Sequence, residues 1–444
     1  MGSSPTLEYC DLSDIGRRRA SNQDARAVLA PWSLDQYRRR GWLFVVADGM
    51  GAHAAGEMAS ALATEHVPLT YEKYAPRSPP LALRESIERA NEEIHTRGEN
   101  AVDLRGMGTT CTALALLPRG ALVGHVGDSR AYRVRRGKIE QLSRDHSLAW
   151  EMEGHKIEGM EEPIPKNIIT RSMGPHAQVT VDLEGPFPVE VGDVFVLCSD
   201  GLSGPVADEE IGLFAATLPP HDSAAALVGL ALVRGAPDNV TVIVAKAGPK
   251  EATKITPGDP PWPMTLEAPA SPGPRPLPWK YLAVAAGSLL VALVFNPWSG
   301  LMRPTGFVGG LLGPTLTQAL AFVMSSLMGL LAIAAISAAA LENLVPASPT
   351  GRVLRNGAKL GGGPYRSYDC APSQPILEGI VSSLESAADG LASTDRDHIR
   401  AAAAACRKRM QANEFTTAVR VAAEAIAIYQ RAVDQARNDD TRPR

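Results

Sequence analysis

Cysteine is scarce in this sequence and never paired at short spacing. Five cysteines are scattered over 444 residues, and none belongs to a CxxC motif. This distribution argues against a disulfide framework and against a thiolate zinc site, and it suits a reducing compartment. The first 14 residues also lack a basic segment followed by an apolar run. We therefore expect no secretory signal and a cytoplasmic N-terminal domain.

An excess of one charge is missing as well. Lysine and arginine number 44 and aspartate and glutamate 48, which gives a formal net charge of −4. This balance favours neither nucleic acid nor an acidic surface as a partner, so we expect no nucleic-acid binding. A chain of this length, with 45% hydrophobic residues, is expected to form two or three folded units.

Residues 1–247 have the pattern of one mixed α/β domain. Helical spacing predicts helices near 54–71 and 82–97. Short apolar runs rich in β-branched residues alternate with turn residues and predict strands. These predicted strands lie at 43–47, 113–117, 121–126, 194–198 and 240–245.

Proline marks the end of this domain. Ten of the 31 residues in 248–278 are proline, which predicts an extended linker. Segment 279–341 follows, with an uncharged run at 281–295 and a longer one whose best span is 316–341. We predict two transmembrane helices here. There are two alternatives. The two segments could be a pair of buried helices in a soluble domain, or they could form one span with an interfacial or re-entrant piece.

Basic residues flank this segment on both sides. Lys280 precedes the first run and Arg352 follows the second, whereas Arg303 is the basic residue between them. The positive-inside rule then predicts a multi-pass protein of the cell membrane, with both ends in the cytoplasm. A flexible linker at 342–369 and an all-α module at 370–444 complete the chain. A small helical bundle without a site of its own is favoured over a degenerate tetratricopeptide-type unit.

Acidic residues stand at the ends of several predicted strands. Two buried strands end in Asp-Gly, at residues 48–49 and 200–201, while Asp128 and Asp238 lie at two further strand edges. A strand end holds a carboxylate rigidly, and the following glycine lets the backbone turn. A single Asp-Gly is only a turn signal. Clustered carboxylates, however, repel one another unless a cation balances them, and oxygen ligands suit Mg²⁺ or Mn²⁺ better than zinc.

Around these residues the sequence resembles the metal-dependent serine/threonine protein phosphatases of type 2C, in their bacterial form. The resemblance covers about residues 9–246 and implies an α/β fold with a central antiparallel β-sandwich flanked by helices. It rests on ordered blocks. They are Ser13-Asp14-Ile15-Gly16 with Arg19 and Asn22-Gln23-Asp24, Val46-Ala47-Asp48-Gly49-Met50-Gly51, Gly108-Thr109-Thr110, Gly127-Asp128-Ser129-Arg130, Asp145-His146-Ser147, Ile169-Thr170-Arg171, Ser199-Asp200-Gly201 and Pro237-Asp238-Asn239-Val240-Thr241.

The resemblance implies a role for each of five positions in a site with two core ions, Mn²⁺ or Mg²⁺. Asp48 resembles the carboxylate that bridges the two ions, and the carbonyl of Gly49 resembles a ligand of the second. Asp200 and Asp238 resemble ligands of the first ion. Asp24 would act through water.

Three further features carry over from the family. Asp128, together with Asp200, resembles the site of a third, weaker metal. Arg19 would hold the substrate phosphate. Residues 150–167 correspond to a flap beside the site.

The expected activity is hydrolysis of phosphoserine and phosphothreonine in proteins by a membrane-anchored signalling phosphatase. A water activated between two metals would attack phosphorus in line, without a covalent phosphoenzyme. A guanidinium fork matches the phosphoryl oxygens. By resemblance, a Ser/Thr kinase is an expected substrate protein. The alternatives are a catalytically weak pseudo-phosphatase that binds phosphopeptides or acts as a scaffold, and C-terminal helices that bind a regulatory protein.

Overall fold

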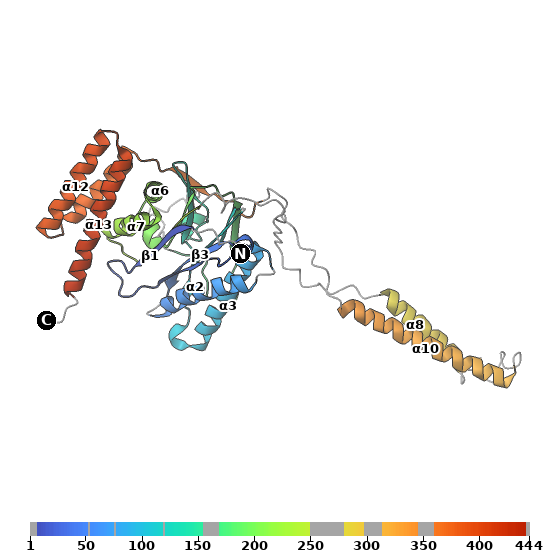
Figure 1. Ribbon diagram of the computed structural model, residues 1–444. Coiled ribbons are helices and arrows are strands. Elements are labelled where there is room, and N and C mark those ends of the chain that lie inside the picture. Colours follow the sequence, from blue (N-terminus) through green and yellow to red (C-terminus); the bar gives the residue numbers. More distant parts are fainter. Residues whose placement is uncertain are drawn as a thin grey trace. The chain divides into compact units, whose positions relative to one another are not determined.

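The computed structural model divides the chain into two compact units (Figure 1). The first comprises Met1–Leu266 together with Val353–Arg444, and the second comprises Glu267–Arg352. From residue 249 on, the predicted linker 248–278 lies outside the described residues. The described residues are 7–51, 54–74, 77–118, 120–153, 168–248, 279–296, 313–344 and 359–440.

Two antiparallel sheets form the centre of the first unit. One has the strand order β1-β11-β10-β7-β8-β12, and the other has the order β2-β3-β5-β6-β9 with β4 paired to β3. All five predicted strands are confirmed, as β3, β5, β6, β10 and β11. The strand bounds are β1 (Glu8–Asp14), β2 (Asp24–Leu29), β3 (Trp42–Met50), β4 (Gly108–Thr109), β5 (Cys111–Leu117), β6 (Gly120–Val126), β7 (Arg130–Arg135), β8 (Lys138–Gln141), β9 (Asp182–Phe187), β10 (Val194–Cys198), β11 (Val240–Lys246) and β12 (Arg366–Asp369).

The interior of the sandwich explains why these strands are continuous apolar runs. Successive side chains of a strand point to opposite faces. In β3, Phe44 and Val46 belong to the core between the sheets, whereas Leu43 and Val45 belong to the core under the helices. Both faces of the strand are therefore buried. A polar side chain on either face would be buried without a hydrogen-bond partner and would destabilise the fold.

Helices cover the outer faces of both sheets. α2 (Ala54–Lys73) and α3 (Pro79–Asn100) pack on the second sheet and confirm the two predicted helices, while α6 (Asp208–Thr217) and α7 (Pro220–Val233) pack on the first. α3 begins with two prolines, which suit the first turn of a helix because its N–H groups have no intrahelical partner. Shorter elements are α1 (Leu34–Arg40), η1 (Val102–Leu104), α4 (Leu148–Glu151) and α5 (Asp200–Ser203).

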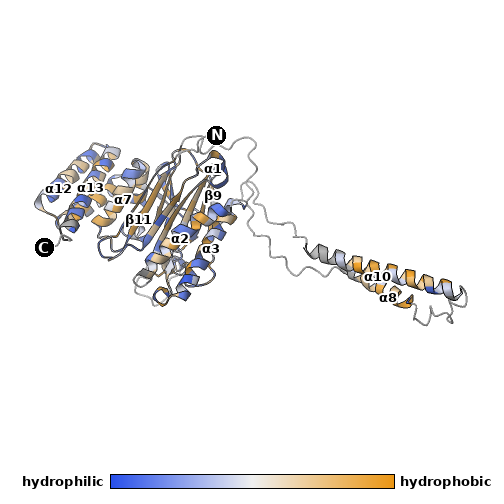
Figure 2. Ribbon diagram, turned by 60° about the horizontal axis from the view of Figure 1, so that its bottom comes forward, coloured by the Kyte–Doolittle hydropathy of each residue, from blue (hydrophilic) through white to orange (hydrophobic). Residues whose placement is uncertain are grey.

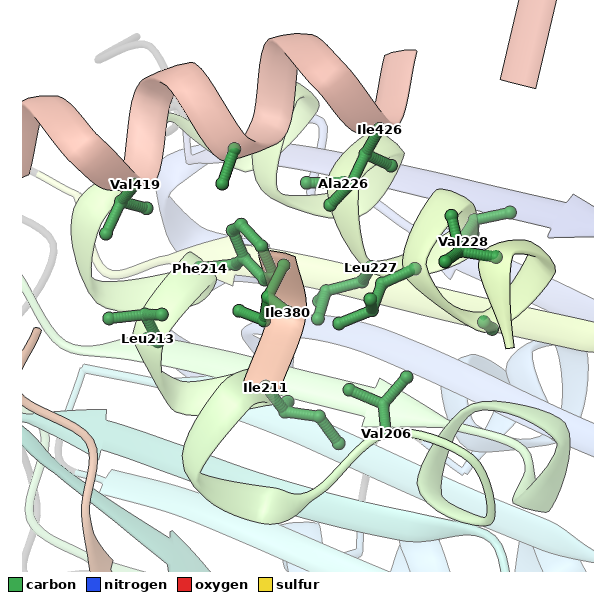
Figure 3. Packing of buried hydrophobic residues seen from close by; sticks show 14 of the residues in the cluster. Val206, Ile211, Leu213, Phe214, Ala226, Leu227, Val228, Ile380, Val419 and Ile426 are labelled. Carbon is green, nitrogen blue, oxygen red and sulfur yellow. The ribbon is translucent and has the colours of Figure 1, made fainter. Parts of the chain in front are cut away.

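The C-terminal helices share a hydrophobic core with α6 and α7. They are α11 (Gln374–Ala388), α12 (Ser393–Gln411) and α13 (Phe415–Asp440). Figure 3 shows Val419 and Ile426 of α13 close to Phe214 and Ala226 of the domain. At Gly229 of α7, an added Cβ would lie 2.2 Å from Cγ2 of Ile426, so glycine permits this close approach.

This packing corrects the sequence-based boundary of a separate module at 370–444. The apolar stripe that the sequence places on the last helix is buried against the N-terminal domain. The physical reason lies in α7, where 11 of the 14 residues are buried. A helix that is apolar on most sides needs cover beyond the sheet on which it packs.

Strand β12 corrects the flexible linker predicted at 342–369. Arg366–Asp369 pairs antiparallel with β8, with Arg366 opposite Gln141 and Tyr368 opposite Ile139. Leu360 also forms an isolated bridge with Gly185 of β9. Residues 345–358 lie outside the described part of the chain. The described end of the predicted linker is therefore the edge strand of a sheet.

The second unit consists, in its described part, of α8 (Trp279–Val294) and α10 (Pro314–Leu344), which pack against each other. Hydrophobic residues dominate both helices in Figure 2. Within the described residues, one helix is long and apolar enough to cross a membrane, with its candidate span at Thr315–Ala335. The apolar part of α8, Ala283–Val294, is shorter than that. The first of the two predicted spans therefore falls short, because a 16-residue helix is about 24 Å long and a hydrocarbon core is about 30 Å thick.

The shared core predicts that a change on α13 destabilises the whole first unit. Ile426→Ala removes a fully buried side chain and should lower the free energy of unfolding by about 2–5 kcal/mol. Urea unfolding of the full chain in mild detergent measures this. Glu424→Ala, at an exposed position of the same helix, is the control and should change stability by less than about 0.5 kcal/mol. Equal effects of the two changes would contradict the shared core.

Candidate metal centre

Five strand ends bring five aspartates to one place. Asp24 and Asp48 stand opposite each other in the β2–β3 pair. Asp200 follows β10, and Asp238 precedes β11 in the neighbouring sheet. The carboxylate of Asp48 feels the charges of Asp24, Asp200, Asp128 and Asp238. The predicted metal residues are thus close together, although they come from distant parts of the sequence.

The backbone around Asp48 is held by two threonines. The hydroxyl of Thr110 lies 2.9 Å from the amide of Asp48 and accepts its hydrogen bond, and the hydroxyl of Thr109 donates to the carbonyl of Asp48 at 2.9 Å. A Cβ added at Gly49 would lie 2.1 Å from the carbonyl oxygen of Gly56. Glycine is therefore required where β3 passes α2, which explains the Asp-Gly pair at this strand end.

Asp24 is oriented by Ser199, the residue before Asp200. The hydroxyl of Ser199 donates to Oδ2 of Asp24 at 2.7 Å and accepts from the amide of Thr241 at 3.0 Å. This one hydroxyl connects three strands, β2, β10 and β11. It therefore couples the position of Asp24 to the strand end that carries Asp200.

Asn239 organises the loop that precedes β2, and sequence reasoning assigned it no role. Its side-chain oxygen accepts from the amide of Gln23 at 2.8 Å, and its amide donates to the carbonyls of Ile15 at 2.8 Å and Ser21 at 3.0 Å. The segment so held contains Arg19 and leads into Asp24. The available signal was its place directly after Asp238, in the block that leads into β11.

Burial makes this cluster costly for negative charge. Burial, and secondly the neighbouring aspartates, raise the pKa of Asp48 well above its usual range. Burial raises the pKa of Asp24 to about 6 and that of Asp128 to about 7, where the carboxylate of Asp200 adds to the effect. Burial likewise raises the pKa of Asp200, with Asp238 as the next cause. The five aspartates cannot all ionise cheaply without a balancing positive charge.

Within the aspartate cluster, two buried carboxylate oxygens have no hydrogen-bond partner, Oδ1 of Asp128 and Oδ1 of Asp200. Buried polar atoms are normally satisfied, so these two oxygens fit a bound hard cation. No three His, Cys, Asp or Glu side chains of the described chain already surround one point as metal ligands. The donor set fits a divalent ion, and the assignment of individual ligands remains a prediction.

Arg19 lies at the edge of the cluster and pairs with Asp238. Its guanidinium Nη2 is 2.6 Å from Oδ2 of Asp238, and the hydrogen bond raises the pKa of Arg19. The side chain is 49% exposed. The predicted phosphate-binding arginine is therefore beside the aspartates and open to solvent. Its role towards phosphate stays a prediction.

A cavity of about 610 Å³ opens beside the aspartates. Asp128, Asp200 and Asp238 line it together with three arginines, Arg130, Arg234 and Arg366. A cavity lined by both acidic and basic groups can hold a cation and an anion next to each other. In the predicted flap at 150–167, residues 154–167 lie outside the described chain.

Comparison with known proteins relates this chain to protein phosphatases. A family model described as protein phosphatase 2C matches residues 16–227. The serine/threonine protein phosphatase PstP of Mycobacterium tuberculosis is 37% identical over 248 residues, which are 54% of this chain and 45% of PstP. Protein phosphatase PhpP of Streptococcus pneumoniae is 32% identical over 256 residues, which are 55% of this chain and 100% of PhpP. The match thus spans about half the length of PstP and all of PhpP.

A solved structure also matches the N-terminal domain. It is the catalytic domain of PstP in complex with 2 manganese ions, and it is 34% identical to this chain. The match covers 54% of this chain and 97% of that one, with a TM-score of 0.45.

The contacts of Asn239 predict a combined loss of stability and metal affinity. Asn239→Ala removes three hydrogen bonds between the buried side chain of Asn239 and partly buried backbone groups, which should cost about 1–3 kcal/mol of unfolding free energy. The loosened segment should also weaken Mn²⁺ binding about 10- to 100-fold, as measured by calorimetry.

Asn91→Ala is the matched control. Asn91 is also buried and makes three hydrogen bonds to backbone, but it ties α3 to residues 174–177. It should lower stability similarly and leave Mn²⁺ affinity unchanged. Equal loss of affinity in both variants would show that Asn239 acts through stability alone.

Proposed function

The chain belongs to the protein phosphatase 2C family of serine/threonine protein phosphatases, and on that premise we propose that it hydrolyses phosphoserine and phosphothreonine in proteins at the aspartate cluster. The observation that carries this proposal is the convergence of Asp24, Asp48, Asp128, Asp200 and Asp238 at one end of the sandwich. Two of these side chains present unpartnered buried oxygens beside an open cavity.

We propose that Asp48, Asp200, Asp238 and the carbonyl of Gly49 hold two Mn²⁺ or Mg²⁺ ions, with Asp24 acting through water. Asp128 would contribute to a third, weaker site together with Asp200. Such ions supply a water activated for attack on phosphorus and balance the developing charge. The carboxylates of this set are hard oxygen donors, as these ions require.

Arg19 would bind the substrate, and two further side chains position the groups of the site. Arg19 offers an exposed guanidinium within reach of the aspartates, and its fork suits the oxygens of a phosphate. Ser199 and Asn239 keep Asp24 and the Arg19 segment in register with Asp200 and Asp238. Phosphoproteins are the proposed substrates, and a Ser/Thr kinase as one of them stays a prediction from resemblance.

The test is turnover of p-nitrophenyl phosphate and of a phosphothreonine peptide by the full chain with Mn²⁺. Asp48→Asn should lower kcat/KM by at least about 10³-fold, because the site loses its central charge. Asp103→Asn, at an exposed aspartate outside the cluster, should have no effect. Tight phosphopeptide binding without turnover in the unmodified chain would overturn the proposal and favour the alternative, a pseudo-phosphatase.

We also propose that the second unit anchors the protein in a membrane. Large apolar side chains on its helices are exposed, among them Leu290, Leu293 and Phe322. Only 17% of the 18-residue apolar stretch that defines the candidate span is buried. A soluble protein rarely exposes so much apolar surface, which speaks against the alternative of two buried core helices.

The connectivity supports an even number of crossings. The parts of the chain before and after this unit, 1–266 and 353–444, belong to one compact unit and share a sheet and a core. They must lie on the same side of any membrane, so α10 cannot be the sole crossing. We propose that α8 and α10 enter the membrane as a hairpin, with local thinning or snorkelling end residues compensating for the shorter α8. The first unit would face the cytoplasm, since basic residues flank the hairpin.

Labelling of introduced cysteines in intact cells tests this topology. A membrane-impermeant thiol reagent should modify Ser299→Cys, between the two helices, from outside. It should modify Ser367→Cys, exposed on β12, only after the cells are permeabilised. Labelling of Ser367→Cys in intact cells would mean that the chain crosses the membrane once. Protection of both cysteines in intact cells would mean that the chain does not cross it, and either result would contradict the hairpin.

A further inference from the structure

One residue that lines the cavity beside the aspartates comes from the chain beyond the apolar hairpin. Arg366 is the first residue of β12, and its side chain lines the same cavity as Asp128, Asp200 and Asp238. The strand is fixed there by its pairing with β8 and by the contacts of Tyr365. The hydroxyl of Tyr365 donates to Oε1 of Glu184 on β9.

The guanidinium of Arg366 is held over an aromatic ring. It lies 3.8 Å from the ring centroid of Trp150, and the ring of Tyr365 meets Trp150 edge-on at 6.2 Å. Arg366 also forms an ion pair with Glu153. Stacking orients the planar group while leaving its edge available for hydrogen bonds. Asp145, which also lines the cavity, feels the charge of Arg366.

The three arginines of the cavity differ in what holds them. Arg130 pairs at 2.7 Å with Asp145, whose side chain is 6% exposed, and also contacts Asp208. Arg234 pairs at 2.5 Å with Glu210, which is 9% exposed. Removing either arginine from its partner would leave a buried carboxylate uncompensated.

The carboxylate that pairs with Arg366 is exposed, unlike the partners of Arg130 and Arg234. Glu153 is 60% exposed, so its carboxylate returns to water at little cost when another anion takes its place. Exposed ion pairs contribute little free energy and exchange readily. Of these three arginines, Arg366 is therefore the one that an incoming acidic group can use.

We propose that Arg366 determines substrate preference, by binding an acidic side chain that lies near the phosphorylated residue of a protein substrate. The incoming carboxylate replaces Glu153 on a guanidinium that Trp150 keeps oriented. This inference rests on the proposed phosphatase function and adds to it a class of substrate, phosphopeptides with neighbouring Asp or Glu. The specificity residue lies in the part of the chain that follows the hairpin.

The experiment compares two phosphothreonine peptides that differ by Glu or Gln at the neighbouring positions. The full chain in detergent should bind the Glu peptide roughly three- to fivefold more tightly and show the same ratio in KM, with kcat little changed. This preference should shrink as ionic strength rises, because it comes from a partly exposed charge pair. Arg366→Gln should abolish the preference, and Arg366→Lys should restore part of it.

Two further variants separate specificity from folding. Glu153→Gln removes the competing carboxylate and should increase the preference. Arg400→Gln breaks an exposed ion pair on α12 and should leave the preference unchanged. Turnover of p-nitrophenyl phosphate, which has no neighbouring residues, should be the same in Arg400→Gln as in the unmodified chain.

The outcomes are distinguishable from those of the proposed function. Peptide affinity is measured by fluorescence anisotropy and needs no turnover, so the Glu-to-Gln ratio tests Arg366 even in a chain without activity. Absence of p-nitrophenyl phosphate hydrolysis would sink the phosphatase proposal alone. An equal ratio in the unmodified chain and in Arg366→Gln, or a loss of affinity for both peptides alike, would overturn the role of Arg366.

Discussion

The structure depends on one electrostatic constraint, the burial of several carboxylates at the end of a β-sandwich. Asp48 is partly buried among acidic side chains, and its neighbours Asp24 and Asp200 lie in the same acidic surroundings. Like charges in a poorly solvated place repel strongly, and the fold tolerates them only because strands hold them rigidly and a cation can balance them. The threonines beneath Asp48, the hydroxyl of Ser199 and the amide of Asn239 all serve this arrangement.

The aspartates at the strand ends could be predicted from the sequence because the pattern that marks them is local. A buried strand that ends in Asp-Gly combines an apolar run with a turn signal, and both lie within ten residues. The steric need for glycine at position 49 follows from the approach of Gly56, yet its effect is visible as a sequence pair. Conversely, Asn239 acts on backbone groups more than 200 residues away, and no local pattern shows which carbonyls it reaches.

The helices of the C-terminal part were predicted, but its packing against the N-terminal domain was not, for a related reason. Strand β12 is four residues long and reads Arg-Ser-Tyr-Asp, which has neither a clear apolar alternation nor a turn that sets its register. Its place as an edge strand is decided by the partner β8. The apolar stripe of α13 was visible in the sequence, but what it packs against was not. Only the tertiary structure shows that Gly229 of α7 leaves room for Ile426.

The same long-range contacts connect the apolar hairpin of α8 and α10, through the chain that follows it, with the cavity beside the aspartates. The N-terminal domain and the returning segment are covalently joined through the apolar hairpin, and they meet again at β8 and at α7. The returning end carries Arg366 into the cavity wall. The carboxylates set the chemistry that this cavity can perform, whereas the segment after the hairpin contributes to which polypeptides reach it.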